Sequence, residues 1–373
     1  MGKIEEMIFY CGISLLMTAT FGLMLPFLIL QISTATGFTG DHTIGVSWVY
    51  LSCVFIFCMV LQWIPRGRLN PKGKAVFITG CDTGFGFLLA KQLDALGMYV
   101  FAGCYLKDKG GDGVKHLEKT GSDRLKVVQL DVSDEESVKK AVKFIEDNLP
   151  SGQKGLWGVV NNAGTSAFGD IEWSSIELYK RVAEVNLWGV IRVTKACLPM
   201  IRRAKGRVVN MASGLSRITA ASRSVYCVSK YGVQCFSDCL RYEMRQWGVK
   251  VSIIEPGNYI AGTNIFTKQS VAALGDRMWG EMSETAKADY GREYFDRKVN
   301  EMVGYCNAGV KDLTPVTDAY EDALLSKHPF IRYNPMTPYW RIRLFIMSIL
   351  PTPIGDYMYI YKDSQTINSS KFN

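Results

Sequence analysis

The segment TGCDTGFG, residues 79–86, stands between the apolar run AVFIT at 75–79 and an amphipathic stretch at 84–97. An apolar run, a glycine-rich turn and a helix form the first half of a βαβ unit. Glycines let the backbone approach a pyrophosphate, and the helix N-terminus supplies N–H donors and the positive end of a dipole. The spacing G-x-x-x-G-x-G therefore predicts a dinucleotide-binding turn directly after the first strand.

The rest of the chain to residue 256 continues this alternation. Five more short apolar runs alternate with amphipathic stretches: YVFAGC (99–104), KVVQLDV (126–132), LWGVVNN (156–162), RVVNMAS (207–213) and KVSIIEP (250–256). Strands that alternate with helices predict an α/β fold, a Rossmann-type doubly wound parallel sheet with right-handed crossovers. The helical, polar stretch 267–304 interrupts the alternation where such sheets carry substrate loops.

A second pattern, Tyr226-Cys227-Val228-Ser229-Lys230, puts a tyrosine and a lysine four residues apart on one helical face. A neighbouring cation is expected to lower the pKa of the phenol from about 10, which would make Tyr226 a usable general base. The same spacing recurs at Tyr294 and Lys298. Only Tyr226 has a strand ending in a serine, Ser213, thirteen residues upstream, at the edge where open sheets bind ligands.

Together these motifs resemble the short-chain dehydrogenases/reductases over about residues 74–335. The resemblance rests on TGCDTGFG, QLDV, Asn161-Asn162-Ala163-Gly164, VNLWG, the serine and tyrosine motifs, and Pro256-Gly257. Within the family the chain looks most like D-3-hydroxybutyrate dehydrogenases, through GCDTGFGFLLAKQLD (80–94), KGRVVN (205–210) and FSDCLRYEM (236–244). Retinol dehydrogenases and a membrane 17β-hydroxysteroid dehydrogenase are similar at a greater distance.

The resemblance implies a role for each matching residue. Tyr226 would be the acid/base, Lys230 would bind the nicotinamide ribose, Ser213 would polarise the reacting oxygen, and Asn186 would hold a relay water. The implied cofactor-binding residues, besides Lys230, are Gly80, Gly84, Phe85, Gly86, Asp131, Asn161, Ala163, Gly164, Pro256 and Gly257. The chain departs from the family at Ala261, where a threonine often binds the carboxamide, and Thr263 is a nearby substitute.

The cofactor is expected to be NAD rather than NADP. A 2′-phosphate needs a cation near the glycine turn or at the end of the second strand, and the residues at those places are Thr83 and Cys104-Tyr105. The acidic residue that usually binds the ribose hydroxyls is also missing, and Lys107 lies close by in the sequence. NADP therefore stays open as the less favoured choice.

Two apolar runs near the N-terminus predict a membrane anchor. Residues 7–30 and 44–64 are long enough to cross a bilayer, and Arg66, Arg68, Lys72 and Lys74 follow at once, which favours a cytosolic catalytic domain. We expect an anchor at 1–71 and a catalytic domain at 72–373, with a C-terminal extension from about 336. The endoplasmic reticulum is favoured, with a mitochondrial membrane as the alternative. Core helices, or one span with a cleaved or interfacial segment, are the other interpretations.

Composition limits the partners. The formal charge is +8, from 43 Lys and Arg against 35 Asp and Glu, but no dense basic block supports nucleic-acid binding, so membrane lipid is the better partner for that charge. The ten cysteines have neither zinc-ligand nor CxxC spacing, so no metal site is expected. The apolar stripe of 224–247 is typical of a dimer interface or of the core, and the segment 339–361 either lies on the membrane or caps the core.

Three functions compete: a dehydrogenase of a small hydroxy acid, the same chemistry on a steroid or retinoid, and a non-catalytic scaffold. The scaffold gives no reason for Tyr226, Lys230, Ser213 and Asn186 to occur together. Arg217 and Arg223 lie between Ser213 and Tyr226, and an arginine fork suits a carboxylate, although either could be a solvated loop residue. The anchor favours a lipophilic substrate, whereas the motif resemblance favours the hydroxy acid.

Overall fold

The computed structural model describes residues 27, 31 and 66–359. The chain divides into two compact units, Met1–Gly67 and Arg68–Asn373, and the second carries every element discussed below. The predicted spans at 7–30 and 44–64 lie outside the described residues, apart from Phe27. Within the described part of the chain, no helix combines the length and the apolar character needed to cross a bilayer.

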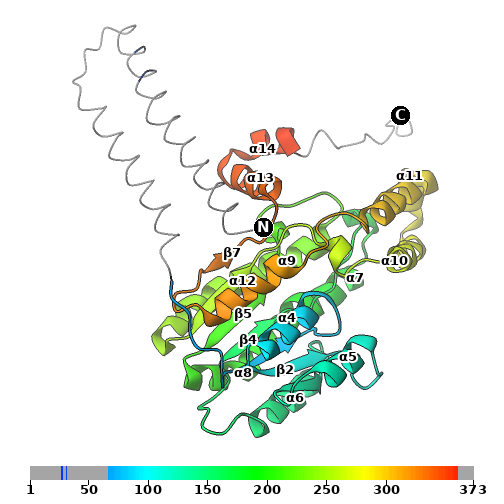
Figure 1. Ribbon diagram of the computed structural model, residues 1–373. Coiled ribbons are helices and arrows are strands. Elements are labelled where there is room, and N and C mark those ends of the chain that lie inside the picture. The colour runs from blue at the N-terminus through cyan, green and yellow to red at the C-terminus, as the bar shows by residue number, and fades with distance from the viewer. Residues whose placement is uncertain (1–26, 28–30, 32–65, 360–373) are drawn as a thin grey trace. The chain divides into compact units, whose positions relative to one another are not determined.

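A parallel sheet of seven strands forms the centre of the second unit, in the order β3-β2-β1-β4-β5-β6-β7 (Figure 1). The strands are β1 (Ala75–Thr79), β2 (Tyr99–Cys104), β3 (Leu125–Gln129), β4 (Gly158–Asn161), β5 (Arg207–Met211), β6 (Lys250–Ile254) and β7 (Arg332–Tyr333). The Rossmann-type parallel sheet is thus confirmed. The two-residue strand β7 was not predicted, because it is too short to form an apolar run.

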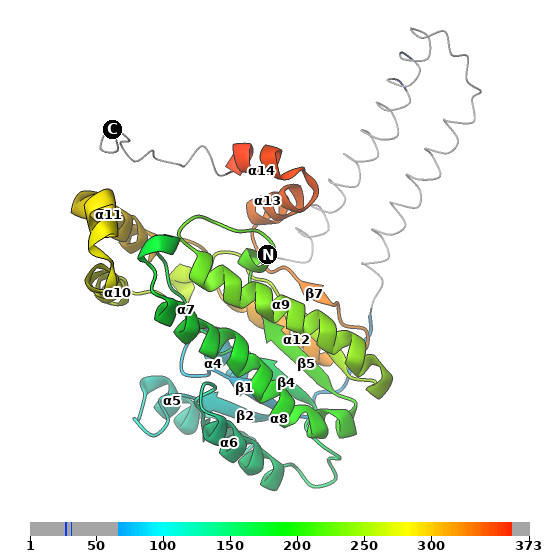
Figure 2. The same ribbon diagram turned by 180° about the vertical axis from the view of Figure 1, so that it is seen from behind.

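Helices cover both faces of the sheet. One face carries α4 (Gly84–Ala95), α5 (Asp112–Thr120) and α12 (Thr314–Leu325). The opposite face carries α6 (Glu135–Asp147), α8 (Gly189–Ala204) and α9 (Ser224–Met244), as seen from behind in Figure 2. Strand β1 explains why both faces are buried: Val76 and Ile78 point into the first layer, while Ala75 and Phe77 point into the second.

The remaining helices lie around the carboxyl ends of the strands. They are α7 (Ile176–Ala183), which continues through a π-helical turn (Glu184–Trp188) into α8, and α10 (Lys268–Glu281), α11 (Glu284–Tyr305), α13 (Pro338–Ile349) and α14 (Thr352–Tyr359). The expected helical stretch 267–304 is therefore a pair of helices, and α11 is kinked at Gly291, whose φ is 75°. The strand order reverses between β1 and β4, which is where open sheets of this kind bind ligands.

Candidate active site

A cleft of about 1330 Å³ opens at the carboxyl ends of β1, β4, β5 and β6. Twelve of the residues predicted for the site line it: Gly80, Gly84, Phe85, Asp131, Ala163, Gly164, Ser213, Arg223, Tyr226, Lys230, Pro256 and Gly257. Four do not: Gly86, Asn161, Asn186 and Arg217. The fold therefore brings together motifs that lie up to 177 residues apart in the sequence, from Gly80 to Gly257.

The glycine turn after β1 is shaped for close backbone approach. Gly80 and Gly84 have φ values of 72° and 62°, which favour glycine. A Cβ on Gly80 would lie 2.8 Å from Cα of Ala163, and one on Gly86 would overlap the carbonyl oxygen of Gly80. Gly86 thus seats α4 against the turn rather than lining the cleft. The N-terminus of α4 carries no acidic side chain in its first turn, so the turn fits the pyrophosphate of a dinucleotide.

Tyr226 and Ser213 meet inside the cleft. Ser213 lies two residues after β5, Tyr226 lies in the first turn of α9, and the Ser213 hydroxyl is close enough to lower the pKa of the phenol. Burial raises the pKa of Tyr226 to about 12, while the Ser213 hydroxyl and the charge of Arg223 oppose that rise. The expected net lowering of this pKa is wrong, because the desolvation of the phenol outweighs the effect of its polar neighbours.

Lys230 lies one helical turn after Tyr226 and is almost fully buried. Its Nζ donates a hydrogen bond of 2.9 Å to the carbonyl oxygen of Met211 and lies 5.7 Å from the centre of the Tyr226 ring. Desolvation lowers the pKa of Lys230 to about 8. The lysine is therefore close enough to act with Tyr226, but near pH 8 about half of it is uncharged.

Asn186 supports the cleft from behind. It is fully buried in the π-helical turn, where its Nδ2 donates to the carbonyl oxygen of Thr165 at 2.9 Å and its Oδ1 accepts from the N–H of Thr165 at 2.8 Å. Thr165 lines the cleft, whereas Asn186 does not. Isolated π-helical turns within α-helices often mark functional sites.

Asn161 belongs to the core rather than to the cleft. Its Nδ2 donates to Thr194 and to Asn210, at 2.8 Å in each case. The next residue, Asn162, lines the cleft and donates to the carbonyl oxygens of Thr79 and Gly80 at 3.0 and 3.1 Å. Because successive side chains along a strand point to opposite faces, Asn161 and Asn162 are not expected to share one environment. This alternation is the sequence signal that separates the core residue Asn161 from Asn162, which contacts the glycine turn.

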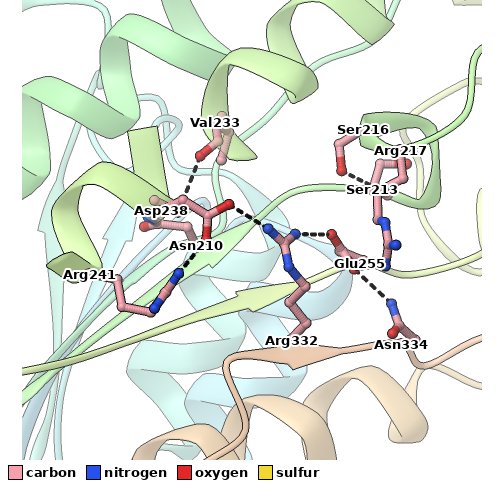
Figure 3. Close-up of polar contacts among 11 residues, drawn as sticks. Asn210, Ser213, Ser216, Arg217, Val233, Asp238, Arg241, Glu255, Arg332 and Asn334 are labelled. Atoms are coloured by element: carbon pink, nitrogen blue, oxygen red, sulfur yellow. Dashed lines mark hydrogen bonds and ion pairs between the residues drawn. The ribbon is translucent and has the colours of Figure 1, made fainter. Parts of the chain in front are cut away.

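The two arginines predicted for the substrate have different environments. Arg217 does not line the cleft, and its Nη1 lies 3.9 Å from Oε2 of Glu255. Glu255 is fully buried and also accepts hydrogen bonds from Arg332 and Asn334, at 2.6 and 2.8 Å (Figure 3). Arg217 therefore belongs to a structural ion-pair network, which is neither the substrate contact nor the solvated loop arginine that the sequence suggested.

Arg223 lines the cleft beside Tyr226. Its Nη2 lies 3.1 Å from the sulfur of Met302, and its guanidinium group lies 5.3 and 5.9 Å from the ring centres of Phe266 and Tyr305. Burial lowers its pKa, and no carboxylate of the described residues lies within ion-pair distance of it. A desolvated cation held only by sulfur and aromatic faces favours an anionic ligand.

Segments after β6 complete the wall of the cleft. Thr263 lines it and Ala261 does not, so Thr263 is the threonine available to a carboxamide. Helix α11 contributes a row of five residues, and α13 contributes two: Tyr294, Lys298, Glu301, Met302, Tyr305, Trp340 and Arg343. Part of the C-terminal extension thus belongs to the site, and the polar stretch predicted to carry substrate loops does line it.

Comparisons with known proteins agree with this geometry. The family model of the short chain dehydrogenases matches residues 74–271. The mitochondrial D-beta-hydroxybutyrate dehydrogenase of Bos taurus is 53% identical over 80% of this chain and 89% of its own. The 17-beta-hydroxysteroid dehydrogenase type 6 of Homo sapiens is 42% identical over 83% and 96%. A solved short-chain dehydrogenase of Streptomyces avermitilis shares the fold, with a TM-score of 0.60 and 21% identity over 79% and 99%. The chain therefore belongs to the short-chain dehydrogenases, oxidoreductases that act on CH–OH groups with a nicotinamide cofactor.

Proposed function

We propose that this protein is an NAD-dependent dehydrogenase that interconverts (R)-3-hydroxybutyrate and acetoacetate. The observation that carries the proposal is Arg223, a half-buried cation that lines the cleft beside Tyr226 with no carboxylate of the described residues to balance it. A hydroxy acid supplies the missing anion and puts its hydroxyl group near the phenol. The 53% identity to a D-beta-hydroxybutyrate dehydrogenase supports the same substrate.

In this proposal each residue of the site has one task. When bound in the cleft, a nicotinamide cofactor would accept a hydride during oxidation and donate one during reduction. Tyr226 exchanges a proton with the substrate oxygen, and Ser213 donates a hydrogen bond to that oxygen. Lys230 binds the nicotinamide ribose and helps to hold Tyr226 in place. Asn186 positions Thr165, which lines the cleft, and also donates to Ser229 of α9; a relay water would lie on this side of the cleft.

The pKa of Tyr226 affects how the rates of oxidation and reduction depend on pH. With a pKa raised to about 12, the phenol is protonated at neutral pH and is ready to donate its proton to a ketone oxygen. Oxidation needs the phenolate, whose fraction rises with pH. We therefore expect alcohol oxidation to become faster toward alkaline pH and ketone reduction to be favoured near neutrality.

The alternative is a membrane-bound steroid or retinol dehydrogenase. The cleft is large, at about 1330 Å³, and aromatic side chains of Phe168, Trp173 and Phe266 form part of its wall, as suits a lipophilic substrate. The 42% identity to a 17-beta-hydroxysteroid dehydrogenase type 6 favours the same interpretation. The charge of Arg223 argues against it, because a neutral alcohol leaves that cation unpaired.

A substrate panel separates the two functions. The purified full-length protein is assayed with NAD and with millimolar (R)-3-hydroxybutyrate, micromolar estradiol or micromolar retinol. Rapid turnover of the hydroxy acid supports the proposal. Robust turnover of estradiol or retinol, with none of the hydroxy acid, would establish the alternative.

The location of the enzyme is part of the proposal. Residues 1–71 anchor the protein, and the catalytic unit faces the cytosol at the endoplasmic reticulum; a mitochondrial membrane is the alternative, supported by the name of the bovine relative. Protease added to intact microsomes should digest the catalytic unit. Protection of the unit would reverse the assigned topology, and recovery of the protein in purified mitochondria would select the alternative.

A further inference from the structure

We infer that Asp82 selects NAD over NADP, by accepting a hydrogen bond from the 2′-hydroxyl of the adenosine ribose and repelling a 2′-phosphate. The inference rests on the proposed function, because it assumes that the cleft binds NAD. It names a residue in the glycine turn, whereas the acidic residue that usually binds the ribose follows the second strand. Here Tyr105 follows that strand.

The position of Asp82 carries the inference. Its side chain lines the cleft, and its two carboxylate oxygens accept hydrogen bonds from the backbone N–H groups of Tyr105 and Leu106, at 2.9 and 2.8 Å. These two residues directly follow β2. The sequence has no acidic residue at the end of β2, but the carboxylate of Asp82, from the neighbouring glycine turn, lies at that position.

The turn that carries Asp82 is held from a second side. Helix α5 packs so closely against it that a Cβ on Gly113 would overlap the carbonyl oxygen of Asp82. Both the backbone and the carboxylate of Asp82 are thus fixed by neighbours. A fixed carboxylate needs little reorganisation to accept a further hydrogen bond on a free lone pair.

The two lysines that follow Tyr105 on the loop after β2, Lys107 and Lys109, do not line the cleft. Lys107 donates from Nζ to the carbonyl oxygen of Val127 at 2.9 Å, and it does not line the cleft. The Nζ of Lys109 lies 5.0 Å from the ring centre of Tyr105, and Lys109 does not line the cleft either. Neither lysine is therefore placed to neutralise a phosphate beside Asp82.

Charge is distributed unevenly along the cleft. Among its described lining residues, all the lysines and arginines come from α9 and the residue before it, from α11 and from α13: Arg223, Lys230, Lys298 and Arg343. The charged residues that line the cleft after β1, β2 and β3 are two carboxylates, Asp82 and Asp131. A 2′-phosphate, which carries close to two negative charges at neutral pH, would face carboxylates there without a cation. A hydroxyl group can instead donate to Asp82.

The test is a comparison of cofactor affinities in the full-length protein in detergent. Dissociation constants for NAD and NADP are measured by fluorescence titration for the wild type, Asp82→Asn and the control Asp108→Asn. Asp108 is exposed on the loop after β2, where Tyr105 and Leu106 donate to Asp82, and it does not line the cleft. Asp82→Asn should tighten NADP binding at least tenfold and weaken NAD binding about threefold to tenfold, while Asp108→Asn should change neither.

A measurement on the wild type makes the inference independent of how the variant folds. The wild type should bind 2′-deoxy-NAD about threefold to tenfold more weakly than NAD, and its preference for NAD over NADP should decrease as ionic strength rises. Equal affinity for NAD and 2′-deoxy-NAD would overturn the inference.

The outcomes separate the inference from the proposed function. If the wild type oxidises (R)-3-hydroxybutyrate with NAD, and Asp82→Asn keeps the same preference for NAD over NADP, only the role of Asp82 is overturned. A wild type that binds NADP more tightly than NAD overturns both that role and the proposed cofactor.

Discussion

Replacing Arg223 by methionine should raise the KM for (R)-3-hydroxybutyrate by about 10- to 100-fold. The guanidinium group contacts only a thioether and two aromatic rings, so no carboxylate of the described residues is left unpaired when it is removed. The loss therefore falls on the substrate, whose charge-assisted hydrogen bond is worth roughly 1.5 to 3 kcal/mol. Methionine keeps much of the apolar volume of the side chain.

The assay is steady-state kinetics of NAD reduction at several pH values. Several values are needed because the charge of Arg223 also lowers the pKa of Tyr226. Its removal should raise that pKa and move the pH dependence of oxidation to higher pH. The KM values of the two proteins are therefore compared at each pH rather than at a single one.

Arg217→Met is the matched control for this prediction. Arg217 points to Glu255 instead of the cleft, and Glu255 keeps its bonds to Arg332 and Asn334 when Arg217 is removed. The KM should change less than about threefold, although the fold should lose some stability because the buried carboxylate of Glu255 loses one of its two cationic neighbours. Equal increases of KM in both variants, or an equal effect of Arg223→Met on a neutral alcohol, would refute carboxylate recognition by Arg223.

Three further predictions address the catalytic groups and the turn. Tyr226→Phe should lower kcat by roughly 10²- to 10⁴-fold without loss of NAD binding, and Tyr294→Phe should keep most of kcat; comparable losses would mean that the active tyrosine is wrongly assigned. Burial lowers the pKa of Lys230 to about 8, so above pH 8 the folded chain has released a proton that the unfolded chain still holds. The free energy of unfolding should therefore rise with pH, by about 1.5 kcal/mol between pH 8 and 9.5. Thermal denaturation of Lys230→Met should lack this increment, and an identical pH dependence would count against a buried lysine. Gly86→Ala should abolish NAD binding and destabilise the fold by about 1 to 3 kcal/mol, since its Cβ would lie 2.6 Å from Nδ2 of Asn162, whereas Gly304→Ala, with open space around it, should be neutral or slightly stabilising.

Periodicity predicted the sheet because each of the strands β1 to β6 is an apolar run buried on both faces. Strand β7 has no such signal. Arg332 and Tyr333 become a strand by pairing with Ile253 and Ile254, about 80 residues upstream. A pairing that arises only in the tertiary structure leaves no local pattern to read.

The site was predicted from motifs, but its electrostatics were not. Arg217 and Arg223 lie in the same segment between Ser213 and Tyr226, and the sequence does not distinguish them. The structure does, because Glu255 lies beside Arg217 and no carboxylate of the described residues pairs with Arg223. Spacing alone put Lys230 near Tyr226, while the net pKa of the phenol depends on burial that spacing does not reveal. The two predicted membrane spans stay predictions.

The most direct test of anion recognition compares one substrate with and without its charge. The specificity constant kcat/KM of the wild type is measured for (R)-3-hydroxybutyrate and for its neutral methyl ester, and again in Arg223→Met. We predict that the wild type prefers the acid by at least tenfold and that Arg223→Met removes most of this preference. Equal kcat/KM for the acid and the ester in the wild type would contradict the account.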